Sequence, residues 1–417
     1  MPERSATRLW GTIALLSLGM AIAFIERVDL SVALASTEFR QFFSIGDTTR
    51  GLLAAAFFLS YALLQIPAGW LADRTRPKHF YAAAFLAWSL ITIGTGFAVS
   101  LYQLVAARLL LGFAESVLTP VTMLWIRSYC PESRRGTAIG ICQAGAKLGS
   151  AVGVPISAWL ILAGGWRFLF IALGMGSLVW LVAWWAIAPN EVPNNAVRSP
   201  AASAAPPEEM LPSSIFASSI FANPILWGVL TGTFCYQYFF YFCVTWMPSY
   251  LVERHHVSLS SLGWYSALSF GGMAVLAVAA GWCADRLIRA GHSAFAVRKW
   301  FTVAGLLFAA TEVIGVWAAS RRVALVFVVV SLCGLGLATA NHWALTQTVF
   351  PKRLIGRVTG LQAFAASLPG LLAPVITGWL KQTTGSYNGP VESILLVLII
   401  GLAAYLVAVR KKFTGCV

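Results

Sequence analysis

The chain has 417 residues, of which 59% are hydrophobic and 11% are charged, with a net charge of +14. Soluble domains are about 45–50% apolar and about 25% charged, so this composition excludes an ordinary soluble protein. No Walker A sequence is present, which argues against transport driven by nucleotide hydrolysis. Because no metal-ligand spacing or nucleophile–base cluster occurs, we expect no enzyme activity, metal or cofactor.

Apolar stretches long enough to cross a bilayer recur from end to end, each of about 20 residues or more. The pattern predicts an all-α integral membrane protein with twelve transmembrane helices. We expect them at residues 9–35, 50–72, 80–99, 101–125, 137–162, 166–188, 224–251, 261–284, 299–318, 322–349, 356–380 and 391–410.

A short motif occurs twice, half a chain length apart. Gly69-Trp70-Leu71-Ala72-Asp73-Arg74 and Gly281-Trp282-Cys283-Ala284-Asp285-Arg286 differ at one position, and each follows the second apolar segment of its half. Internal repeats of this kind are how many carriers are built. We therefore expect two pseudo-symmetric six-helix halves, residues 1–188 and 224–417, joined by a Pro- and Ser-rich cytoplasmic loop at 189–223.

The distribution of basic residues predicts the orientation. Most Lys and Arg fall in the loops and tails on the side of both termini, which the positive-inside rule places in the cytoplasm. This topology explains the net charge better than a nucleic-acid partner does.

The first apolar segment could imitate a signal peptide, but Glu26, Arg27 and Asp29 separate its apolar core from any small-residue cleavage site. We expect a multi-pass protein of the bacterial inner membrane.

Charged side chains inside predicted spans are costly and need a reason. The first span carries Glu26, Arg27 and Asp29, and the fourth carries Arg108 and Glu115, which lie two turns apart on one face. One interpretation is that these charges neutralise one another and hold the two helices together. In that interpretation Asp29, nearer the outer end, is a solvated or packing residue.

The other interpretation is an anion site, because several cations, Arg27, Arg108 and Lys147, lie within the spans with few acids. Arginine presents a planar fork that suits a carboxylate, and a nearby acid that gains or loses a proton could switch that site. Gln143 and Lys147 share one face of the fifth span. Lys147 is either a substrate contact or a partner of Glu115 or Glu26, and the sequence leaves both open.

Five motifs in order resemble the anion:cation symporter branch of the major facilitator superfamily, which includes bacterial sugar-acid carriers, sialin and vesicular glutamate transporters. The matching pieces are Glu26-Arg27-Val28-Asp29-Leu30-Ser31, Gln65-Ile66-Pro67-Ala68-Gly69-Trp70, the Arg108–Glu115 segment, Tyr241 to Glu253, and Gly356-Arg357-Val358-Thr359-Gly360-Leu361-Gln362. The departures are Glu26 where aspartate is usual, Ala363 and Ser367 where asparagines are common, and Ala146 beside Lys147 where some sugar-acid carriers have an amide.

The resemblance implies proton coupling through Glu26 and Glu115 and anion binding or gating through Arg27 and Arg108. Further substrate-binding candidates lie on other helices: Tyr61, Gln143, Lys147, Tyr238, Tyr241, Asn341 and Gln362. For the three tyrosines, plain helix packing or a position in an interfacial aromatic belt is the alternative. The role of His342, next to Asn341, stays open between a core residue and a proton relay. The repeated motif supplies gating candidates: Asp73, Arg74, Asp285 and Arg286.

We therefore expect a monomeric, proton-coupled symporter that imports a small organic anion, such as a sugar acid or another carboxylate, by alternating access. The alternative is an anion exchanger or a drug or metabolite:proton antiporter on the same fold. A non-transporting membrane sensor is a third class, which the lack of a recognisable signalling domain disfavours.

Overall fold

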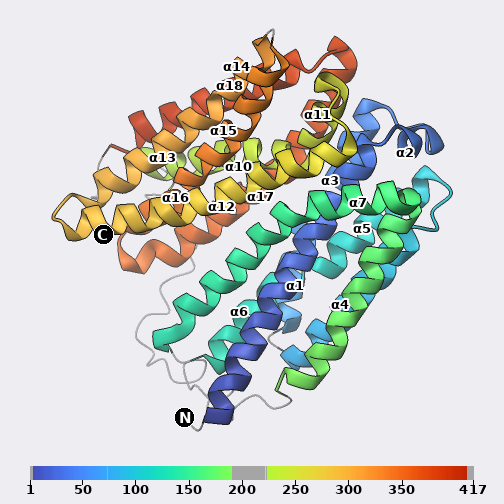
Figure 1. Ribbon diagram of the computed structural model, residues 1–417. Helices are drawn as coiled ribbons and strands as arrows, with labels where there is room; N and C mark the ends of the chain where they lie inside the picture. The colour runs from blue at the N-terminus through green and yellow to red at the C-terminus, as the bar shows by residue number, and fades with distance from the viewer. Residues whose placement is uncertain are drawn as a thin grey trace.

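The computed structural model describes residues 3–72, 74–130, 132–189, 221, 223–318 and 320–410. Helices make up all the regular structure of these ranges. The helices form two bundles, which lie side by side in Figure 1. The bundle from the first half of the chain contains α1 (Glu3–Ala35), α2 (Thr37–Phe42), α3 (Asp47–Ala72), α4 (Pro77–Thr95), α5 (Leu101–Glu115), α6 (Leu118–Tyr129) and α7 (Glu132–Ile187).

Helix α7 comprises two spans in one continuous assignment. Its backbone leaves helical geometry at Gly164, with ψ of 15°, and at Gly165, with φ of 77°. A positive φ is readily adopted by glycine, which has no Cβ, so this pair permits the reversal between spans. The break lies between the predicted ends at residues 162 and 166.

The second bundle begins after the central loop of the chain. Most of the loop predicted at 189–223 lies outside the described residues, as do residues 411–417. This bundle contains α10 (Pro224–Thr245), α11 (Met247–His255), α12 (Leu259–Arg289), α13 (Ala294–Ala310), α14 (Glu312–Trp317), α15 (Arg321–Thr339), α16 (Asn341–Val349), α17 (Lys352–Thr384), α18 (Asn388–Ala403) and the π-helix η2 (Ala404–Ala408).

Eight described stretches are long and apolar enough to cross a membrane by length and composition. One of them, Ala138–Ile187, contains the Gly164–Gly165 break and supplies two spans. With α3, α4 and α10, the described residues provide the twelve spans that the hydropathy pattern predicts. Several spans consist of two consecutive helices, such as α5 with α6 and α15 with α16.

One lysine in each bundle makes the same kind of contact with the end of that bundle's last span. The Nζ of Lys78, at the start of α4, donates to the carbonyl oxygens of Trp185 (3.0 Å) and Ala188 (2.7 Å) at the end of α7. The Nζ of Lys299 in α13 donates likewise to Leu406 (3.4 Å) and Val409 (2.9 Å) after α18. Each lysine caps unpaired carbonyls at the C-terminus of the last span of its bundle. The duplication thus extends to contacts that the two sequence motifs do not show.

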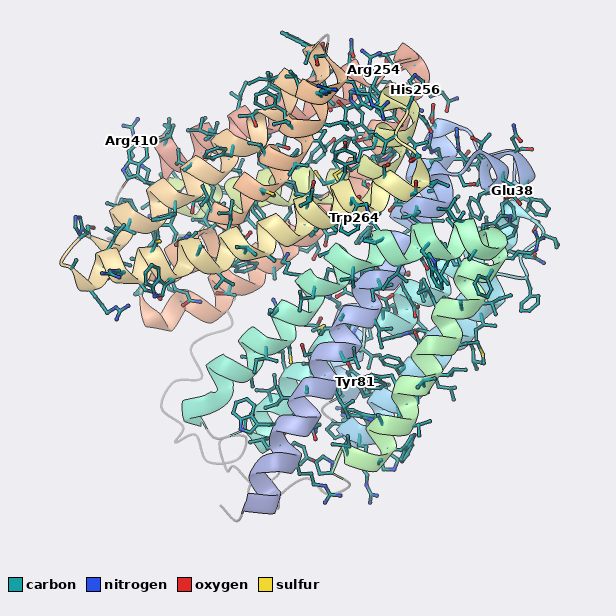
Figure 2. The ribbon with its side chains drawn as sticks, viewed as in Figure 1. Glu38, Tyr81, Arg254, His256, Trp264 and Arg410 are labelled. Carbon is teal, nitrogen blue, oxygen red and sulfur yellow. The ribbon has the colours of Figure 1, made fainter. Side chains whose placement is uncertain are left out.

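The bundles approach each other most closely near α2 and α11 and diverge away from them (Figure 1). At this meeting end α3 contacts α17, and α7 contacts α12. A Cβ on Gly51 would overlap the backbone of Pro374, and one on Gly263 would lie 2.9 Å from the Cα of Pro155. Glycine therefore allows these helices to touch. Figure 2 shows Glu38 at the meeting end and Arg410 far from it.

Candidate functional site

Arg27 of α1 and Glu115 of α5 form a buried ion pair in the first bundle. Their Nε and Oε2 atoms are 2.8 Å apart, and the side chains are 7% and 0% exposed. The Arg27 guanidinium also lies 4.6 Å from the ring centroid of Tyr61 and 4.5 Å from that of Phe24, as a cation–π interaction requires. One arginine nitrogen, Nη2, and one carboxylate oxygen, Oε1, are buried without a hydrogen-bond partner in the described structure. The pair thus keeps free donor and acceptor capacity.

A second ion pair joins the same two helices. Arg108 Nη2 lies 3.2 Å from Asp29 Oδ1, and both side chains are buried. Arg108 and Glu115 therefore both face α1, as their spacing predicts. The charges do neutralise one another across the helices, but the pairs leave polar atoms unmatched. Asp29 is fully buried, so of its two predicted roles the solvated one is wrong and the packing one remains.

Glu26 occupies a different environment from its neighbour Arg27. Its carboxylate accepts hydrogen bonds from the hydroxyls of Thr92 (2.6 Å) in α4 and Ser177 in α7, and the side chain is fully buried. The structure thus places the two expected proton-coupling acids in separate settings. Glu115 contacts the arginine, whereas Glu26 lies inside the first bundle.

Lys147 of α7 extends toward the second bundle. Its Nζ lies 4.4 Å from the ring centroid of Phe240 in α10. No acid of the described residues lies within ion-pair distance of it, so neither Glu115 nor Glu26 is its partner here. Gln143, one turn away on α7, is exposed and has no side-chain hydrogen bond in the described structure.

Tyr61 and Tyr241 lie near Arg27 from opposite bundles. Tyr241 contacts Phe58 edge-to-face, with ring centroids 4.7 Å apart, and both tyrosines are close enough to interact electrostatically with Arg27. Tyr238 does not join them, because it packs among buried residues near the hydroxyl of Ser393 in α18.

Three polar side chains of the second bundle have unpaired acceptor atoms. Asn341 donates to Leu337 O and Gln362 donates to Thr233 Oγ1, both at 2.9 Å, but their side-chain oxygens have no partner in the described structure. His342 Nδ1 lies 2.8 Å from Ala338 O, which fixes the proton on Nδ1 and leaves Nε2 unpaired. All three side chains are buried.

A small cavity lies between the ion pairs and the meeting end. Its volume is about 20 Å³, room for about one water molecule. The lining comes from both bundles: Arg27, Leu30, Ser31, Leu34, Ala54, Phe57, Phe58, Arg108 and Thr245. The cavity is therefore too small to hold an organic molecule between the meeting end and the ion pairs in this conformation.

An ionic cluster that the sequence analysis missed seals the same end. We use this name for Arg40, Asp47, Arg50, Glu253 and Lys381. Lys381 Nζ lies 2.7 Å from both Asp47 Oδ1 and Glu253 Oε2, and Arg50 Nη1 lies 2.8 Å from Asp47 and from Glu253. The cluster connects α2 and α3 of the first bundle to α11 and α17 of the second.

The electrostatics of the cluster keep its acids ionised. Burial alone would raise the pKa of Glu253, but Arg50, Lys381 and Arg40 outweigh it and hold that pKa below its usual value. Burial likewise opposes ionisation of Asp47, whose pKa is lowered by Lys381 and Arg50. Both carboxylates are therefore charged at neutral pH.

The gating candidates lie at the other end of the bundles. Asp285 pairs with Arg298 of its own bundle at 3.0 Å and is 61% exposed. Arg74 stacks on Trp70 and Arg286 on Trp282, with guanidinium-to-centroid distances of 3.6 and 5.4 Å. Asp73 lies outside the described residues. Asp285, Arg74 and Arg286 make no ion pair between bundles in the described structure, in keeping with the divergence there.

Curated relatives match this chain along nearly its whole length. A D-galactonate transporter of Escherichia coli is 26% identical, with 96% of each chain covered. A protein named as a probable sulfoacetate transporter of Cupriavidus necator is 29% identical, over 94% of this chain and 91% of the relative. One named as a probable galactarate/D-glucarate transporter of Escherichia coli is 26% identical, over 98% and 94%.

Solved structures share the fold. A bacterial homologue of the human lysosomal transporter Spinster superposes with a TM-score of 0.78 at 19% identity, over all of both chains. A D-xylose–proton symporter gives 0.78 at 14% identity, over 97% of this chain and 98% of the other. The model of the Major Facilitator Superfamily matches residues 10–374. The chain therefore belongs to the major facilitator superfamily, and it is a membrane transporter and not an enzyme.

Proposed function

We propose that this protein is a proton-coupled symporter that imports a small organic anion of the sugar-acid class across the bacterial inner membrane. Relatives named as transporters of D-galactonate, galactarate or D-glucarate support the substrate class. The carrier acts as a monomer of two six-helix halves, residues 1–188 and 224–417. Both termini and the linking loop are cytoplasmic, so the meeting end with its ionic cluster faces the periplasm.

The buried pair of Arg27 and Glu115 is the observation that carries the proposal. While Glu115 is ionised, it compensates the guanidinium and competes with any other anion. A proton on Glu115 removes that competitor and leaves the planar fork of Arg27 free for a substrate carboxylate. Binding of the anion and binding of the proton therefore favour each other, which is the thermodynamic requirement for symport.

The two ends of the molecule supply the alternation of access. In this conformation the ionic cluster closes the periplasmic end and the bundles diverge toward the cytoplasm. Rocking of the halves about the central ion pairs would break the cluster and bring the two repeated motifs together. Asp73, Arg74, Asp285 and Arg286 then close the cytoplasmic end.

The test is uptake by the purified protein in proteoliposomes. Labelled D-galactonate should accumulate when the outside is made acidic, and a protonophore should abolish the accumulation. Equal exchange across the membrane without any response to the pH gradient would instead identify an anion exchanger. No transport of any sugar acid or short organic acid would contradict the proposed function.

A further inference from the structure

We propose that the preferred substrate is a dianion, with Lys147 binding the second negative group while Arg27 binds the first. This inference rests on the proposed function, because it names the substrate class of the same site. Its basis is the charge balance of the described residues around the centre of the molecule and the positions of the two cations.

The charge balance leaves Lys147 uncompensated. Arg27 pairs with Glu115, and Arg108 pairs with Asp29. The two other acids buried within spans, Glu26 and Glu312, are bonded to serine and threonine hydroxyls elsewhere in the bundles. Among the described residues, the groups that interact with Lys147 are the ring of Phe240 and the imidazole of His342, neither of which carries negative charge.

The geometry places the two cations against consecutive residues of α10. Arg27 lies near Tyr241, and Lys147 lies over Phe240, whose ring centroid is 5.7 Å from that of Tyr241. Arg27 comes from α1 and Lys147 from α7, so both cations extend from the first bundle toward the same stretch of the second. A small molecule lying across these two rings would, on this inference, contact both cations.

A dianion satisfies this arrangement better than a monoanion. Once Glu115 takes up a proton, Arg27 and Lys147 are two cations without a counter-charge in a low-dielectric setting, where an unpaired charge is costly. A monocarboxylate compensates one of them, whereas a dicarboxylate or a sulfonate-carboxylate compensates both. A second charge-assisted hydrogen bond is worth about tenfold or more in affinity.

A matched pair of ligands tests the inference directly. D-Galactonate and galactarate share their carbon skeleton and differ at one end, where a hydroxymethyl group replaces the second carboxylate. We expect the purified wild-type carrier to bind galactarate about tenfold or more tightly than D-galactonate, as measured by calorimetry at neutral pH. Equal binding of the two, or tighter binding of D-galactonate, would overturn the dianion inference but leave the proposed function standing.

The variant Lys147→Gln tests whether Lys147 binds the second negative group of the ligand. The variant should lose the preference for galactarate over D-galactonate, and Lys147→Arg should retain it. If Lys147→Gln keeps the wild-type preference, Lys147 does not bind the second group. Because the wild-type comparison needs no variant, a folding defect in Lys147→Gln would not remove the test. Failure of the wild type to bind any sugar acid, sulfoacetate or other short organic acid would contradict the proposed function itself.

Discussion

Glu253→Gln should open the meeting end of the carrier, which we propose faces the periplasm. Glu253 lies within 3.3 Å of Arg40, Arg50 and Lys381, and the Tyr387 hydroxyl donates to it at 3.0 Å. Glutamine has nearly the same shape but no charge. The substitution therefore removes one of the two acids that hold three cations of the ionic cluster together across the bundles.

The structure sets the size of the effect. Hydrogen bonds to charged groups contribute about 1.5–3 kcal/mol each. The carboxylate is 18% exposed, so solvent screens part of this energy, and Asp47 continues to hold Arg50 and Lys381. We expect the substitution to destabilise the closed meeting end by a net free energy of about 2 kcal/mol. This corresponds to a shift of about 30-fold in the ratio of inward-facing to outward-facing carriers.

The assay is labelling of a cysteine in the small cavity behind the cluster. Ala54→Cys, in a background without the native cysteines, lines that cavity and is shielded in the closed conformation. A membrane-impermeant maleimide added from outside should react faster when Glu253→Gln is also present. Glu38→Gln is the matched control, because Glu38 is exposed at the same end and pairs with no cation in the described structure.

Two results would refute this reasoning. The first is an unchanged labelling rate in Glu253→Gln, and the second is an equal increase in the Glu38→Gln control.

The lowered pKa values of the two acids also predict how labelling depends on pH. Because the pKa values of Asp47 and Glu253 are lowered in the cluster, its stabilisation is present above their ordinary values and is lost as the pH falls through the lowered values. Labelling of the wild type at this position should therefore not change between pH 6 and 8 by titration of the cluster.

Arg27→Ala should abolish anion binding. Arg27→Lys should weaken binding about tenfold or more, since an ammonium group cannot replace the planar guanidinium. Calorimetry on the detergent-solubilised variants measures both effects. Glu115→Gln should retain exchange of labelled substrate in proteoliposomes but lose accumulation on a pH gradient. Glu312→Gln, which changes a buried acid bonded to Ser331 at 2.5 Å, should keep both activities. Lys78→Met and Lys299→Met should each destabilise the protein by about 1 kcal/mol through loss of a helix cap, measured by thermal unfolding; unequal effects would argue against equivalent roles in the two halves.

The sequence alone determined the membrane class, the number of spans and most of their limits. Hydropathy and helix length act within one segment, so the apolar stretches predict α3, α12 and α17 without knowledge of their neighbours. The Gly164–Gly165 break was predictable for the same local reason. The seven-residue spacing also placed Arg108 and Glu115 on one helix face, which the structure turns toward α1.

Tertiary structure decided which charges meet. Asp47 and Lys381 lie far apart in the chain, and they pair because α3 crosses α17 where Gly51 lets the backbones touch. The direction of Glu26, away from Arg27, likewise depends on hydroxyls of α4 and α7. Sequence spacing fixes neighbours along one helix, but partners on different helices depend on how those helices cross, because ion pairs and hydrogen bonds need their atoms within about 3–4 Å.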